Sequence, residues 1–105
     1  MRLTAEGRAA ELAADHRPTL AVDETGRVRG LATLNRYFGQ MEFKERGEIH
    51  WAGPLGSTPM AGPEPFMNQE AAFLSALEAV DRASLRDGRL ILEDTTGQTQ
   101  IEFER

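Results

Sequence analysis

Residues 19–52 read TLAVDETGRVRGLATLNRYFGQMEFKERGEIHWA, and this stretch decides the fold. Short apolar segments alternate in it with turn residues about every eight to twelve positions, a spacing typical of all-β sandwiches and barrels. Residues 37–44 alternate with the period of a strand, so one face is expected to carry Tyr37, Gly39, Met41 and Phe43.

Three further strands are predicted around that one, at residues 19–22, 27–33 and 49–52. A hairpin loop at residues 23–26 ends in a glycine, which adopts the positive φ of such a turn without steric cost. In the strand that follows, Val28 and Leu31 are expected to point inward.

One later segment has helical spacing. Its apolar positions are Phe73, Leu74, Leu77 and Val80. A helix is therefore predicted from about Met67 to Arg82, with Glu78 placed to form an exposed ion pair with Arg82. The proline-containing stretch at residues 61–65 cannot join a central strand and leads into this helix.

Both ends of the chain add strands. Asp87-Gly88 and the turn at residues 94–97 indicate two closing hairpins, the last strand running over residues 98–104. Leu3 opens an edge strand, and residues 6–14 are compatible with a helical turn or with a loop. The pattern predicts a mainly β (α+β) fold, in which the helix covers a strongly curved antiparallel sheet of about seven or eight strands.

Length and composition define the class of protein. The 105 residues suit a single domain, 1–105, and there is no cysteine for a disulfide, a thiol nucleophile or a zinc knuckle. The net charge is 12 − 17 = −5 without a cluster of lysine and arginine, so no nucleic-acid partner is expected. No apolar run approaches the ~20 residues of a membrane span. Without a signal peptide or lipobox, a cytoplasmic location is expected from the sequence as it stands.

Two motifs resemble the META domain family, the family of the bacterial heat-shock protein HslJ. GLATLNRYFG at residues 30–39 is similar to the family's strand, Gly-Cys-Asn-Arg-aromatic turn and glycine. GPLGSTPMAG at residues 53–62 is similar to its Thr-Arg-Met-Ala-Cys stretch, which precedes a helix that opens with a glutamate. The positions that match are Gly30, Asn35, Arg36, Tyr37, Gly39, Thr58, Met60 and Glu70.

The chain departs from the family pattern at four positions. Leu34 and Gly62 replace the two cysteines, so a thiol or disulfide role cannot operate here. Thr33 stands where the family has glycine, and Pro59 replaces the arginine.

The resemblance implies a small lipocalin-like half-barrel with the helix packed on or plugging it. It implies no established enzymatic activity, and no cofactor is expected. It suggests a stress-associated accessory or protein-interaction module with an unknown protein partner, in the periplasm or envelope, where relatives are secreted or are lipoproteins. The matching positions are then expected to be mainly structural.

The residues themselves support no catalytic or metal site. His16 and His50 are the only histidines, and neither has a ligand or catalytic partner at a matching spacing. Ser57 and Thr58 are expected to bond to local backbone at a turn, because no nucleophile-elbow motif surrounds them.

Glu70 is unusual because it falls on the apolar stripe of the predicted helix. A buried carboxylate requires hydrogen-bond donors, which we expect from backbone N–H groups near the helix N-terminus or from Arg36. A ligand-contacting role for Glu70 and Arg36 is the alternative.

A second hypothesis makes the protein a carrier of an apolar ligand such as a lipid, since small barrels can enclose a cavity. The residues that would line that cavity are Phe43, Trp51, Phe73, Leu77 and Phe103.

Overall fold

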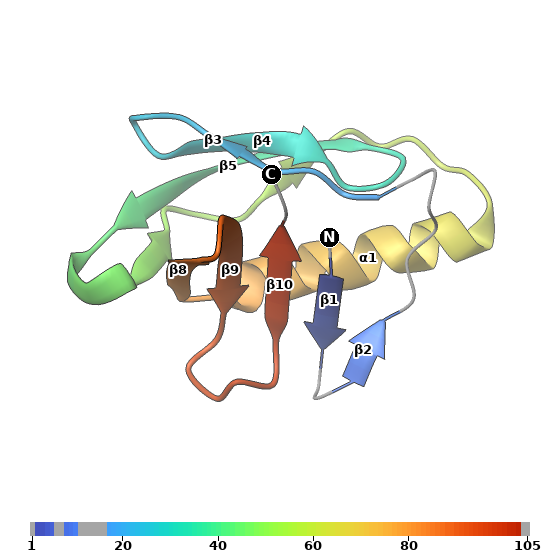
Figure 1. Cartoon of the computed structure of the whole chain (residues 1–105). Helices are drawn as coiled ribbons and strands as arrows, with labels where there is room; N and C mark the ends of the chain where they lie inside the picture. Colours follow the sequence, from blue (N-terminus) through green and yellow to red (C-terminus); the bar gives the residue numbers. More distant parts are fainter. Residues whose placement is uncertain (1, 6–7, 11–16, 104–105) are drawn as a thin grey trace.

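The structure is a computed structural model that describes residues 2–5, 8–10 and 17–103. The chain forms two antiparallel sheets and one long helix, α1 (Glu64–Ala79), which runs along both sheets (Figure 1). The predicted mainly β fold with one packed helix is thereby confirmed. Within the described residues the strands form two separate sheets and no closed barrel.

The first sheet contains the residues that decide the fold. Its strands, in the order β3-β4-β5-β6 with β7 also paired to β5, are β3 (Ala21–Val22), β4 (Arg27–Leu31), β5 (Arg36–Phe43), β6 (Ile49–Trp51) and β7 (Gly56–Ser57). Val28 pairs with Gly39 and Gly30 with Tyr37, so these residues share the inner face. Leu31 was expected to point inward and is instead 45% exposed, because three positions along a strand from Val28 lead to the opposite face.

The second sheet joins the two ends of the chain. Its strands, in the order β2-β1-β10-β9-β8, are β1 (Arg2–Ala5), β2 (Arg8–Ala10), β8 (Arg82–Arg86), β9 (Arg89–Glu93) and β10 (Gln100–Phe103). Leu3 is buried and pairs with Ile101, so its strand is interior and not the predicted edge. Of the stretch left open between helical turn and loop, residues 8–10 form the edge strand, and 6, 7 and 11–14 lie outside the described residues.

Helix α1 begins and ends three residues earlier than predicted. Proline is compatible with a first helical turn, where its missing N–H would have no partner, so the helix starts at Glu64 beside Pro65. At the other end Val80 is extended, with φ −75° and ψ 142°. Arg82 consequently lies in β8, and the helical ion pair predicted between Glu78 and Arg82 is wrong.

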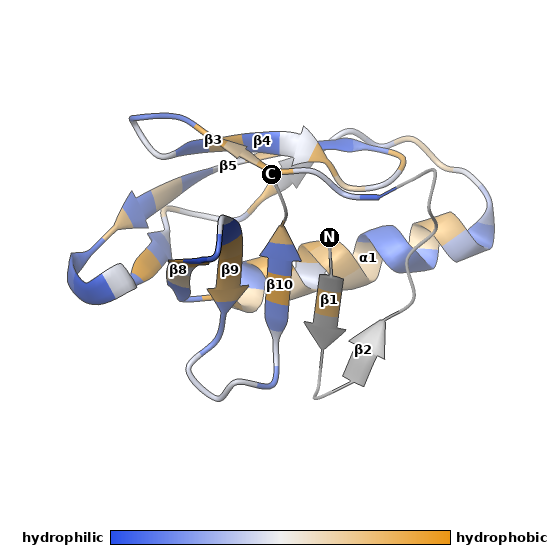
Figure 2. Ribbon diagram, viewed as in Figure 1, coloured by the Kyte–Doolittle hydropathy of each residue, from blue (hydrophilic) through white to orange (hydrophobic). Residues whose placement is uncertain are grey.

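The core lies where α1 meets both sheets. Phe73 packs edge-on against Tyr37 of β5, with ring centroids 5.4 Å apart, and against Phe103 of β10 at 6.4 Å. Apolar residues line the helix face and the strands opposite it (Figure 2). The helix therefore fills the space between the sheets, as expected from its apolar stripe. In the part of the chain that the structure describes, no helix is long and apolar enough to cross a membrane.

Candidate functional site

Most motif positions meet in a buried polar network around Asn35. Glu70 reaches the loop before β5 from α1, and its Oε1 accepts hydrogen bonds from the backbone N–H groups of Leu34 (2.9 Å) and Asn35 (2.7 Å). Its Oε2 accepts one from Asn35 Nδ2 (2.6 Å). The predicted burial of Glu70 against backbone donors is confirmed. The expected position near the helix N-terminus is wrong: Glu70 is the seventh residue of its helix, past the free N–H groups of the first turn, and its donors belong to the loop before β5.

The rest of the Asn35 side chain holds the segment after β7. Its Nδ2 also donates to the carbonyl of Met60 (2.9 Å), and its Oδ1 accepts from Met60 N (2.7 Å) and Thr58 Oγ1 (2.8 Å). All four hydrogen-bonding positions of the amide are thus used. One side chain ties together the loop, the β7 segment and α1.

Two sequence expectations about this network are wrong. Thr58 does not bond to local backbone: its hydroxyl donates to Asn35 and accepts from the backbone N–H of Arg36 (3.2 Å). The side chain of Arg36 is exposed on the opposite face and supplies no donor to Glu70. Alternation along β5 explains this, since Arg36 and Tyr37 are neighbours and must face opposite sides.

Thr33 introduces strain beside the network. Its φ of 152° is a backbone conformation that favours glycine, the residue that the family pattern has here. Gln69 Nε2 donates to the Thr33 hydroxyl (2.9 Å) and helps to hold this buried residue. The sequence shows that Thr33 replaces the glycine of the family pattern, but only the φ angle in the structure shows that this replacement strains the backbone.

Gly30, Gly39 and Tyr37 act through close packing. A Cβ on Gly30 would collide with the carbonyl of Thr19, and one on Gly39 would lie 2.6 Å from a methyl carbon of Leu55. The hydroxyl of Tyr37 donates to Thr19 O (2.6 Å), and burial raises the pKa of this phenol, which keeps it neutral.

Among the described residues, the hydrogen bonds of this network do not form a reactive centre. Each carboxylate and amide oxygen of Glu70 and Asn35 already accepts a hydrogen bond, which leaves neither group aimed at a substrate. No group of three potential ligands gathers for a metal ion within the described residues. His16 lies outside those residues.

His50 is exposed and borders a polar hollow of about 260 Å³ with Glu48, Asp81, Arg82 and Thr95. The Oδ1 atom of Asp81 is buried and has no hydrogen-bond partner among the described residues.

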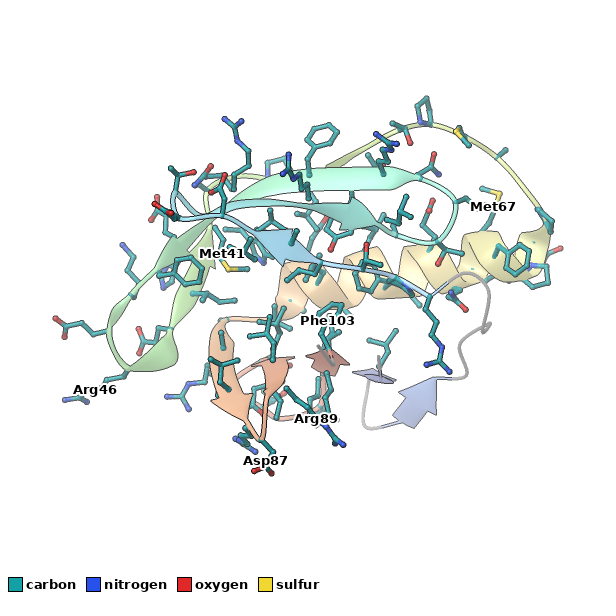
Figure 3. All side chains as sticks on the ribbon, turned by 45° about the horizontal axis from the view of Figure 1, so that its top comes forward. Met41, Arg46, Met67, Asp87, Arg89 and Phe103 are labelled. Carbon is teal, nitrogen blue, oxygen red and sulfur yellow. The ribbon has the colours of Figure 1, made fainter. Side chains whose placement is uncertain are left out.

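The five aromatic and apolar residues expected to line a cavity are in different environments. Phe73 and Leu77 are fully buried, and Trp51 and Phe103 pack against the same cluster. In Figure 3 the Phe103 side chain points from β10 toward α1, into this packed region. Phe43 is the last residue of β5 and is 57% exposed, so it is not part of the core. The hollow beside His50 and two further hollows next to Phe38 contain none of these five residues in their lining.

A different surface stands out on the other side of the first sheet. We call it the arginine face, and it consists of the outward side chains of Arg27, Arg29, Leu31, Arg36 and Phe38. Register places Arg29 opposite Phe38 and Arg36 opposite Leu31, so basic and apolar groups alternate across the strands. Leu31 and Phe38 are 45% and 54% exposed. Sequence reasoning missed this face because it took Leu31 for a core residue.

Comparisons with known proteins agree with the fold. A family model for the META domain matches residues 2–105. An NMR structure of a protein from Burkholderia xenovorans superimposes with a TM-score of 0.78 at 26% identity, covering 100% of this chain and 78% of that one. A second NMR structure, at 21% identity and a TM-score of 0.65, covers 97% and 86% and shows the fold alone. No curated protein matches the sequence significantly.

Proposed function

The chain belongs to the META domain family, and from this premise we propose that it is a non-enzymatic accessory module that binds another protein through the arginine face. The observation that carries the proposal is the exposure of Leu31 and Phe38 side by side with arginines on a regular sheet. Exposed apolar groups that are grouped and rimmed by polar ones are typical of interaction sites. Aromatic and arginine residues are also those that dominate binding energy at protein interfaces.

The inner side of the same strands supports this reading. Tyr37 and Met41 are buried against α1 and its neighbours, so the sheet is a rigid support for its outer face. Little conformational entropy would be lost when a partner binds such a surface.

The carrier hypothesis has weaker support. A bound lipid would require an internal cavity of ~300 Å³ or more between the sheets and the helix. The Phe73 ring occupies that region in contact with both sheets, and Leu77 is fully buried in the same cluster.

The family resemblance adds a cellular context to the proposal. It implies an association with stress and a place at the cell envelope, where an accessory protein would meet its partner.

Affinity capture from cells of the natural source tests the proposal. The wild-type protein is expected to enrich a partner that the double variant Leu31→Ser/Phe38→Ser loses. Leu85→Ser is the matched control, since it removes a 74% exposed apolar side chain from the other sheet and should keep the partner. Equal capture by the double variant and the wild type would contradict the proposal. Native mass spectrometry of the purified endogenous protein adds a second check, because a bound lipid would favour the carrier.

A further inference from the structure

We propose that the arginine face binds an acidic, extended segment of a partner protein, in which carboxylates meet Arg29 and Arg36 and an apolar side chain packs against Phe38. This inference names the partner's chemistry and rests on the interaction function proposed above.

The charge of the face differs from that of the chain. The protein carries a net charge of −5, yet β4 (Arg27–Leu31) and β5 up to Gln40 contain three arginines and no acidic residue. Arg29 and Arg36 form no ion pair with any described residue. Arg27 is different: it lies near Asp23, whose pKa is lowered mainly by the hydrogen bond from Thr25 and to a lesser extent by the charge of Arg27. Arg29 and Arg36 are therefore the guanidinium groups available to an acidic partner.

The spacing of these two arginines suits an extended chain. Arg29 lies opposite Phe38, two positions from Arg36 on the same strand, so the two arginines are diagonal cross-strand neighbours. The Cα atoms of such diagonal neighbours are about 7–8 Å apart. Alternate side chains of an extended segment repeat every ~6.6 Å, which allows two carboxylates at alternate positions to reach both arginines.

Hollows on both sides of Phe38 give the face its shape. One of about 360 Å³ is bordered by Arg29, Leu31, Arg36 and Phe38. The other, of about 530 Å³, is bordered by Phe38, by Gln40 farther along β5 and by Pro54 in the segment between β6 and β7. An apolar side chain placed in either hollow would contact the ring of Phe38.

Gly56 holds this ring in place. A Cβ on Gly56 would collide with the ring of Phe38 and lie 2.7 Å from its Cζ, so the ring packs directly on the β7 backbone. The ring is thus preorganised for contact even though its outer side is exposed.

An anionic bilayer is the other partner that would attract arginines. Attraction to anionic lipids depends on several basic residues acting together, and stable attachment needs additional buried apolar groups. This face offers three arginines on a chain that is acidic overall, and its apolar groups border concave hollows. A peptide segment is the better match.

Titration of the ¹⁵N-labelled full chain with the short peptide Ser-Glu-Ser-Glu-Ser-Leu-Ser tests the inference by NMR, because in an extended chain both glutamates and the leucine then lie on one face. We expect saturable chemical-shift changes confined to β4, β5 and β7. Two control peptides, one with lysine in place of both glutamates and one with serine in place of the leucine, separate the acidic from the apolar contribution and should both bind more weakly. Vesicles of phosphatidylglycerol provide the membrane arm and should cause no loss of signal.

Variants of the face assign the binding to its residues. Arg29→Ser/Arg36→Ser is expected to weaken peptide binding about tenfold or more, because charge-assisted hydrogen bonds are lost. Arg82→Ser/Arg86→Ser removes the same charge from β8 of the other sheet and should leave binding within about twofold of wild type, since distant exposed charges are screened. Gly56→Ala retains every charge and displaces the Phe38 ring, and it should weaken binding severalfold.

The outcomes are distinguishable from those of the proposed function. Equal binding of the lysine peptide at the same residues would overturn the acidic partner while the interaction face itself remained. Shifts elsewhere, no binding, equal weakening by both double arginine variants, or binding to vesicles alone would each overturn this inference. Only the capture experiment decides whether the face binds a protein in the cell.

Discussion

On the inner side of the β4–β5 hairpin, Val28, Tyr37 and Met41 have almost no contact with water, whereas on the outer side Leu31 and Phe38 keep about half of their surface exposed. Neighbouring residues of the same two strands therefore serve different purposes. The inner side chains are held by α1 and stabilise the fold. Among the described residues no layer covers the outer side chains. Replacing them should therefore change the free energy of unfolding only slightly.

The largest expected effect comes from the layer that covers the inner side. Phe73→Ala should lower the free energy of unfolding by about 3–5 kcal/mol, because it removes a fully buried ring that contacts both Tyr37 and Phe103. Phe38→Ala removes the same ring from the outer face and should cost less than about 1 kcal/mol. Urea denaturation of both variants measures the difference. Similar losses for the two would mean that the faces are not energetically distinct.

A smaller effect is expected in the polar network that closes one end of the inner side. Glu70→Gln should destabilise the protein by about 1–3 kcal/mol. Both carboxylate oxygens of Glu70 accept hydrogen bonds from N–H donors, whereas the NH₂ group of glutamine is itself a donor and would face one of these donors without an acceptor. Glu78→Gln, at an exposed position of the same helix, should change stability by less than about 0.5 kcal/mol. An unchanged thermal midpoint for Glu70→Gln would argue that its role is not structural.

The smallest effect concerns the strained residue beside this network. Both Thr33→Gly and Thr33→Ala lose the hydrogen bond from Gln69, but only glycine is relieved of the strain at φ 152°. The glycine variant should therefore be more stable than the alanine variant by about 1 kcal/mol, the reverse of the usual order in regular structure. Denaturant midpoints of the pair provide the measurement, and the usual order would show that Thr33 is unstrained.

The local elements of the fold were predictable from residue patterns. Alternation in residues 37–44 and the Asp87-Gly88 turn indicate strands and a hairpin because both signals arise between near neighbours. The helix was placed with an error of three residues at each end, since Pro65 is compatible with a first turn and the stop at Val80 has no strong local signal. Periodicity could not tell which sheet each strand would join.

The candidate site shows the same division. The unusual position of Glu70 on an apolar stripe predicted that it is buried and bonded to backbone donors. Spacing could not pair Glu70 with Asn35, or Asn35 with Thr58, because 35 and 23 residues separate the bonded groups. The arginine face depends on which side of β4 the helix covers, and assigning Leu31 to the core concealed it.

The amino-acid sequence by itself determined the classes of local structure, the absence of cysteine chemistry and the membership in the META domain family, since each depends on residue identity and short spacing. Only the tertiary structure decided that the strands form two sheets, that Asn35 joins three distant segments, and that arginines and exposed apolar groups share one outer face. The physical reason is that burial and long-range hydrogen bonds depend on which elements pack together, a property of the whole chain that no local pattern contains.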